Sequence, residues 1–448
     1  MMMADQTYET TTIDPSLLRT LLEDDAFHPT EPSTLEETGL SETLVESLIC
    51  KQLAMFGNST GRSLANEICL PFSVVGRILD QLRSRKLVAH VSPTRLNDFI
   101  YVLTEKGIVH AQELMRDSPY VGPAPVRLSE YVLSVEAQSI SHEAPDRDRL
   151  QRACQAISVD PKLFQALGPA INSSGGMFLY GAPGNGKSTL ARHITACFGQ
   201  KIWIPYAVIE SGQIIKLFDA QFHRVAEDGD DGPLRTTSFD RRWVRIQRPT
   251  VVVGGELTLE NLELRHHRDS NVCEAPLQMK SNCGCLLIDD FGRQRIAPKD
   301  LLNRWIVPLD ARHDFLTLPS GKKIQVPFEQ IVIFSTNLEP EDLVDEAFLR
   351  RIPYKIRATD PTDEEFHHLF RMYCEKLACE YRKDVVNYLL DTHYRPCNRA
   401  KRRCHPRDLL IQVRNYCRYN GQPMEMLPEY FDIVVHSYFA MVLKTEHQ

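Results

Sequence analysis

The sequence lacks the patterns that mark membrane-spanning, secreted and disulfide-stabilised proteins. No apolar run in the 448 residues approaches the roughly 20 residues that a helix needs to cross a bilayer. The first residues show no basic stretch followed by an apolar one, which a signal peptide requires. The 12 cysteines include no C-x-x-C pair, so we expect reduced thiols. These absences predict a cytoplasmic protein without membrane insertion.

A strong basic excess and internal repeats are absent too. The net charge of −7 excludes a protein that coats nucleic acid along its whole length, although a local basic patch remains compatible with it. His393, Cys397, Cys404 and His405 could instead be zinc ligands rather than metal-free side chains. Their spacing, however, fits no standard structural zinc site. The length predicts two or three domains.

The most specific pattern that is present is G-x-x-x-x-G-K-[ST], which binds phosphate. An apolar run that predicts a buried strand precedes it, and a run that predicts a helix follows. Glycines let consecutive backbone N–H groups curl around a phosphate chain, and the helix N-terminus adds partial positive charge there. The predicted nucleotide-binding residues are Gly181, Ala182, Pro183, Gly184, Asn185, Gly186, Lys187, Ser188 and Thr189. Within them, Lys187 can reach the β- and γ-phosphates, and Ser188 can ligate Mg²⁺.

Two further apolar strands end in polar residues. Cys285–Ile288 leads into Asp289 and Asp290, which predicts one carboxylate for the Mg²⁺ shell and one that polarises the attacking water. The run 330–334 leads through Ser335 and Thr336 to Asn337, which we expect to orient that water. We place this strand between the two strands that face the phosphates.

Three arginines are candidates for stabilising charge on the phosphoryl group. Arg350 and Arg351 precede Ile352, and a guanidinium there can be supplied by a neighbouring subunit. Arg351 is the better candidate of the two, without the choice being settled. Arg407, at the start of a C-terminal helix, is placed to reach the nucleotide from a lid. The nearby basic residues are interpreted as solvated lid surface.

The N-terminal residues predict a small α+β domain. Residues 1–40 are acidic and expected to be poorly ordered, apart from a short helix near Ser16–Glu23. Over 41–117 we expect three helices, two strands and a last helix, a pattern that resembles a winged helix-turn-helix. The third helix exposes Arg77 and little else that could contact bases, so DNA binding and protein docking are equally favoured. Residues 118–144 are expected to form an extended linker.

Together, these signals resemble the AAA+ ATPase family, in particular bacterial AAA-family ATP-binding proteins. The resemblance implies a P-loop α/β parallel sheet over 145–357 and a helical lid over 358–448. It implies ATP and Mg²⁺ as cofactors and a homo-oligomer, a ring or spiral that is most simply a hexamer, with shared sites. It makes 181–189 Walker A, Asp289 and Asp290 Walker B, Asn337 sensor 1, Arg350 or Arg351 the arginine finger and Arg407 sensor 2.

Three departures from the family pattern stand out. Asp290 replaces the usual glutamate, and Lys187 and Asp289 are 102 residues apart, more than a minimal member needs. The extra residues, roughly 210–280, include an acidic turn at 227–232 and a strand-like run at 250–257. A hairpin is predicted over 315–326, where several remodelling members carry one that points into the ring pore. The leading hypothesis is a remodelling ATPase whose N-terminal domain chooses the target, and the alternative is an ATP-gated DNA-binding regulator.

Overall fold

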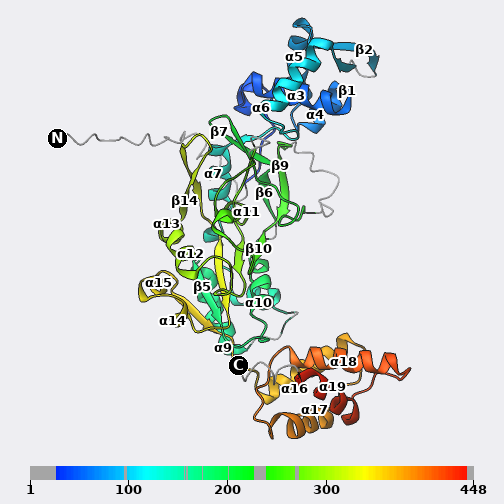
Figure 1. Cartoon of the computed structure of the whole chain (residues 1–448), viewed down its shortest axis with the longest axis vertical. Coiled ribbons are helices and arrows are strands. Elements are labelled where there is room, and N and C mark those ends of the chain that lie inside the picture. Colours follow the sequence, from blue (N-terminus) through cyan, green and yellow to red (C-terminus); the bar gives the residue numbers. More distant parts are fainter. Residues whose placement is uncertain are drawn as a thin grey trace, which may run out of the picture.

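The computed structural model describes residues 27–94, 98–155, 157, 160–173, 175–199, 201–226, 239–267 and 272–440. Along its longest axis, a small N-terminal unit lies at one end, a helical bundle lies at the other, and the sheets lie between them (Figure 1). The helix expected near Ser16–Glu23 and the acidic turn at 227–232 lie outside the described residues. Among the helices of the described ranges, none combines the length and hydropathy needed to cross a membrane.

The N-terminal unit contains the helices and strands that the sequence predicts. Apolar side chains at helical spacing bury one face of its helix α5 (Phe72–Ser84), including Val75, Ile78 and Leu82. A third strand, which the sequence did not predict, forms at residues 58–60 and pairs with β3, giving the antiparallel order β1-β3-β2. Its elements are α3 (Glu42–Phe56), β1 (Asn58–Thr60), α4 (Gly61–Glu67), α5 (Phe72–Ser84), β2 (Val88–Thr94), β3 (Asp98–Leu103) and α6 (Glu105–Asp117).

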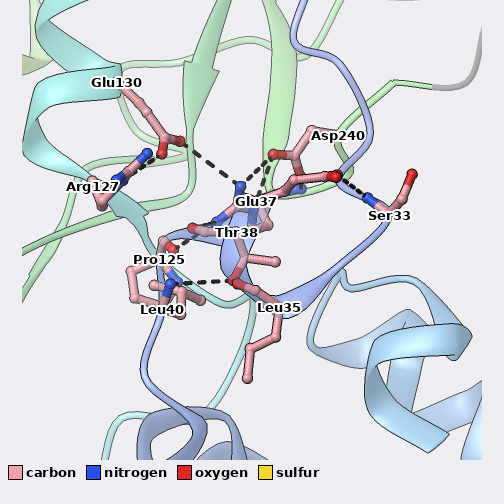
Figure 2. A network of polar contacts seen from close by, with 10 residues as sticks. Ser33, Leu35, Glu37, Thr38, Leu40, Pro125, Arg127, Glu130 and Asp240 are labelled. Atoms are coloured by element: carbon pink, nitrogen blue, oxygen red, sulfur yellow. Dashed lines mark hydrogen bonds and ion pairs between the residues drawn. The ribbon is translucent and has the colours of Figure 1, made fainter. Parts of the chain in front are cut away.

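A buried arginine holds together the two segments that flank the N-terminal unit. Arg242 forms an ion pair with Asp240 at 2.7 Å, and it donates to the backbone oxygens of Thr38 at 3.0 Å and Pro125 at 3.3 Å. Figure 2 shows Thr38, Pro125, Glu130 and Asp240 converging at this joint. Thr38 ends helix α2 (Leu35–Thr38), so the prediction of poor order is wrong for residues 27–40.

Removing the Arg242 guanidinium should destabilise the protein strongly. The two side chains of the Arg242–Asp240 pair are only 2% and 4% exposed, so Arg242→Met leaves a buried carboxylate without its partner. We expect a loss of about 3–5 kcal/mol in the free energy of unfolding, measured by urea titration. Arg83→Met is the matched control, because its pair with Asp80 is exposed and should contribute less than about 1 kcal/mol. Equal losses for the two variants would contradict a structural role for the joint.

The predicted linker over 118–144 is wrong in its second half. Residues 126–127 form strand β4 (Val126–Arg127), which pairs with β7 (Ala207–Glu210), and helix α7 (Leu128–Ala137) follows directly. The Tyr131 side chain of α7 is buried, and its hydroxyl donates to the backbone oxygen of Met279 at 3.2 Å. This segment therefore belongs to the folded body of the protein.

The central sheet is parallel and five-stranded, as the AAA+ resemblance predicts. Its order is β10-β13-β16-β5-β17, so β16 lies between the strand before the phosphate loop and the strand before the paired acids. The predicted position of the sensor strand is confirmed, and the sheet has the parallel α/β arrangement that the AAA+ resemblance implies. The strands are β10 (Thr250–Val253), β13 (Cys285–Ile288), β16 (Ile331–Thr336), β5 (Gly176–Tyr180) and β17 (Tyr354–Arg357). The strand-like run at 250–257 thus supplies an edge strand of this sheet and is not part of an insertion.

Residues inserted between the phosphate loop and β13, together with β4, build two further sheets. One has the order β11-β12-β8-β7-β4, and another pairs β6 with β9. The predicted hairpin forms as β14 and β15, but Leu316, Ile324 and Val326 are buried in the apolar core of these sheets, so it is not a free loop. The additional strands are β6 (Lys201–Pro205), β8 (Gln213–Lys216), β9 (Trp243–Gln247), β11 (Arg265–His267), β12 (Val272–Glu274), β14 (His313–Thr317) and β15 (Lys323–Pro327).

Helices flank the central sheet and form the lid. Those of the α/β part are α8 (Arg147–Ala153), α9 (Pro161–Asn172), α10 (Lys187–Ile194), α11 (Leu277–Lys280), α12 (Pro298–Arg304), α13 (Ile306–Ala311), α14 (Pro340–Leu343) and α15 (Glu346–Arg351). Those of the lid are α16 (Asp363–Lys376), α17 (Lys383–Leu389), α18 (His405–Tyr419) and α19 (Pro428–Ala440). The lid helices surround their own apolar core, which includes Phe366, Leu389, Val413 and Phe431.

Candidate functional site

The phosphate loop connects β5 to α10 through backbone conformations that need glycine. Gly181, Gly184 and Gly186 all have positive φ, of 128°, 81° and 80°. A Cβ on Gly181 would lie 2.6 Å from the backbone oxygen of Ala358, so a side chain there could not fit. Gly186 caps the N-terminus of α10, which directs that end of the helix at the loop. This is the strand–loop–helix context that the motif predicts.

Lys187 is buried at the centre of the site. Its Nζ donates to the backbone oxygens of Gly181 at 2.8 Å and Ala182 at 3.1 Å, and to Oδ1 of Asn337 at 2.8 Å. The pKa of this amine is lowered, mainly because the amine is buried. The charges of Asp289 and Asp290 oppose that effect, and the charge of Arg402 adds to it. The cation expected to bind phosphate is thus surrounded by the other predicted site residues.

The two acids after β13 face the phosphate loop and the sensor strand. Ser188 donates through its hydroxyl to Oδ1 of Asp289 at 2.8 Å. Asn337 donates through its amide to Oδ1 of Asp290 at 3.3 Å. Asp290 itself has a φ of 51°, an uncommon conformation that aims its side chain away from the path of the strand. The structure therefore brings Lys187, Ser188, Asp289, Asp290 and Asn337 into one connected group.

The oxygen donors of this group fit a magnesium ion. Mg²⁺ is bound through hydroxyl, carboxylate and phosphate oxygens together with water, and proteins supply one or two of these ligands. Ser188 Oγ and the Asp289 carboxylate already lie within hydrogen-bonding distance of each other. These two side chains would hold the ion, and the ion would neutralise charge on bound phosphates.

The two candidate finger arginines lie outside this group. Arg351 is tied within its own chain, since its Nε bonds Asp310 at 2.8 Å and its Nη1 bonds the backbone oxygen of Ala347 at 3.0 Å. Arg350 is exposed, and no polar partner is found for its side chain among the described residues. Of the two, Arg350 is the more exposed and Arg351 has partners within its own chain, whereas the sequence favoured Arg351 as the finger.

The structure does not bring Arg407 to the phosphate loop. Its Nε pairs with Asp408 at 2.8 Å, and more than half of its side chain is exposed. Residues just before it make the contact instead, because the Cys404 backbone N–H donates to the Gly184 oxygen at 2.9 Å. The lid arginine whose charge acts on Lys187 is Arg402. Sequence reasoning grouped it with the solvated lid residues, although it lies only three residues before the same helix.

Most basic lid residues are paired and shielded from solvent, so their interpretation as solvated surface is wrong for Arg399, Lys401, Arg402 and Arg403, whereas it holds for the exposed Arg395. Arg403 is largely buried and bonds Glu365 at 3.0 Å, Lys401 pairs with Asp363, and the Arg399 guanidinium lies 3.7 Å from the centre of the Phe439 ring.

The zinc alternative gains no support from the lid. His393 bonds Asp432 at 2.6 Å, and His405 bonds the Tyr394 hydroxyl at 2.9 Å. In the described part of the chain, no group of three histidine, cysteine, aspartate or glutamate side chains is placed to hold a metal ion. The two histidines thus have other partners and do not converge with the cysteines.

Comparison with known proteins finds one family model, and it covers the lid only. Residues 362–437 match a family described as a domain of unknown function, DUF8689. None of the curated proteins compared matches the chain.

Solved structures resemble the chain distantly. NtrX from Brucella abortus is 15% identical with a TM-score of 0.39, over 61% of this chain and 54% of that one. NtrX in complex with ATP is 14% identical with a TM-score of 0.38, over 63% of this chain and 56% of that one. A RuvB point mutant from Thermotoga maritima is 12% identical with a TM-score of 0.37, over 63% of this chain and 70% of that one. The chain thus spans little more than half of NtrX, and these values carry no conclusion about its activity.

Proposed function

We propose that this chain, whose fold and motifs support assignment to the AAA+ ATPases, binds ATP with Mg²⁺ and hydrolyses it. One observation carries the proposal. Ser188 bonds Asp289, while Asp290 bonds Asn337, which in turn accepts a bond from Lys187. Three segments far apart in the sequence thus meet at the end of the sheet, where the phosphate loop begins a helix. The chemistry that needs this set is phosphoryl transfer to water.

Each residue has a distinct task in this proposal. The loop N–H groups and Lys187 bind the phosphates, Ser188 and Asp289 hold Mg²⁺, and Asp290 polarises the attacking water. Asn337 orients that water, since its amide already bonds the Asp290 carboxylate. Asp290 has a shorter side chain than glutamate, so the water must sit closer to the backbone.

Hydrolysis in this proposal needs a second subunit. No arginine from α15 contacts the group around Lys187 among the described residues, and the Arg350 side chain is exposed. A guanidinium from a neighbouring copy would complete the site, as in a ring or spiral of identical subunits. Arg350 is our choice for that residue, and Arg351 is the second candidate.

The target is selected by the N-terminal unit in the leading hypothesis, in which ATP turnover remodels a protein or nucleoprotein. The alternative is a switch, in which bound ATP controls the assembly of a DNA-binding regulator. The packing of the β14–β15 hairpin favours the switch. Its Lys322 also bonds Glu210 at 2.9 Å and Ser211 at 2.8 Å, so the hairpin is not poised to thread a target.

Asp290→Asn tests the proposed chemistry. The amide keeps the bond to Asn337 but cannot polarise water, so ATP binding should persist while hydrolysis falls by at least about a hundredfold. Calorimetric titration with ATP and an assay of released phosphate measure the two properties. Asp289→Asn is the matched comparison, and it should lose the Mg²⁺ dependence of binding. Full turnover by Asp290→Asn would remove Asp290 as the residue that activates water.

A further inference from the structure

One carboxylate oxygen at the hinge is shared by the phosphate loop and the lid. Asp360 lies between the end of β17 at Arg357 and the start of α16 at Asp363. Its Oδ1 accepts a hydrogen bond from the Asn185 amide at 2.7 Å, and the same oxygen pairs with the Arg402 guanidinium. Asn185 is a variable position of the phosphate-loop motif, so the general function of that motif does not explain this contact.

The lid segment that carries Arg402 is seated on the phosphate loop. The Arg403 backbone N–H donates to Oδ1 of Asn185 at 3.3 Å, and the Cys404 backbone N–H donates to Gly184. Burial lowers the pKa of His405 to about 4, so this ring is neutral at physiological pH. Its Nδ1 accepts the N–H of Arg402 at 3.3 Å. The backbone of Arg402 is therefore fixed next to the loop, and only its side chain has to move to reach a bound phosphate.

We propose that Asp360 is a positioning residue that retains the Arg402 guanidinium at the hinge until the phosphates of ATP compete for it. The proposal rests on the ATP-binding function proposed above. A triphosphate carries several negative charges and accepts bidentate bonds from a guanidinium, so it competes well with one carboxylate. Transfer of Arg402 leaves the Asn185–Asp360 bond in place. The hinge thereby stays attached to the loop while the lid gains a contact with the nucleotide.

The two side chains therefore have opposite effects on ATP affinity, and the effects depend on each other. Asp360→Asn frees Arg402 and should tighten ATP binding about three- to tenfold. Arg402→Gln removes the cation and should weaken binding about tenfold. In the Arg402→Gln background, Asp360→Asn should change affinity by less than about twofold, because no guanidinium is left to release.

The experiment is calorimetric titration of Mg²⁺-ATP into the full chain carrying each single change and both. Asp363→Asn is the matched control, since Asp363 pairs with Lys401 and Arg395 of the same lid region but does not contact Asn185. It should leave ATP affinity unchanged. Asp360→Ser replaces Asp360→Asn if the amide variant does not fold.

Two results overturn the inference. If Asp360→Asn tightens ATP binding equally in the unchanged and the Arg402→Gln backgrounds, Asp360 simply repels the phosphates and does not act through Arg402. Weaker binding by Asp360→Asn would mean that Asp360 only supports the fold of the hinge. If the unchanged chain binds ATP but shows either result, the inference alone fails, whereas absence of ATP binding by the unchanged chain defeats the proposed function itself.

Discussion

Lys187→Ala should lose at least about a hundredfold in affinity for ATP. The amine is the side-chain cation at the centre of the site, and its three present partners are neutral oxygens that phosphates can replace. Alanine leaves the backbone of the loop but removes that charge. Calorimetric titration with ATP in the presence of Mg²⁺ measures the loss.

Arg192→Ala is the control for this change. Arg192 lies on the same helix, α10, but its side chain is exposed to solvent. It should bind ATP like the unchanged chain, and thermal unfolding should show both variants folded. Normal ATP affinity in a folded Lys187→Ala variant would mean that nucleotide, if it binds, binds elsewhere.

Arg350→Ala should bind ATP almost normally and lose about a thousandfold or more in hydrolysis, as arginines supplied to phosphoryl-transfer sites do. The exposed guanidinium makes no contact that its own site needs. Arg351→Ala should lose less, because its side chain is engaged by Asp310. Phosphate release by each variant, at matched protein concentration, measures the difference.

Mixing identifies where the arginine acts. Subunits with Arg350→Ala keep an intact Asp290, and subunits with Asp290→Asn keep an intact Arg350. Some interfaces of the mixture therefore hold both groups, and activity should exceed that of either variant alone. If the mixture stays inactive while each variant still forms oligomers, the site is not shared in this way. If light scattering shows that the active species is a monomer, the site is likewise not shared between subunits.

Local patterns predicted which of these side chains the structure brings together. The phosphate loop, the acids after β13 and Asn337 after β16 each follow a short buried strand, a signal contained in a few consecutive residues. The parallel sheet then brings the ends of those strands together, so the group around Lys187 follows from local sequence and topology alone. The lid helices were likewise predictable from apolar residues at helical spacing.

Contacts between distant segments were not predictable in the same way. The ion pair of Arg402 with Asp360 joins residues 42 positions apart, and nothing in a basic run distinguishes it from solvated surface. The packing of the β14–β15 hairpin depends on a core that includes residues more than a hundred positions earlier, such as Ile202 and Ile204. Helix α7 did carry a signal, the helical spacing of Leu128, Tyr131 and Val135, which the prolines just before it obscured.

The most direct test is the release of phosphate from ATP by the purified full chain over a range of protein concentrations. We predict Mg²⁺-dependent release whose rate per subunit rises with concentration as shared sites are completed, and no release by Lys187→Ala. Absence of release at every concentration, or equal release by Lys187→Ala, would contradict the assignment of an ATP-hydrolysing site to Lys187, Asp289, Asp290 and Asn337.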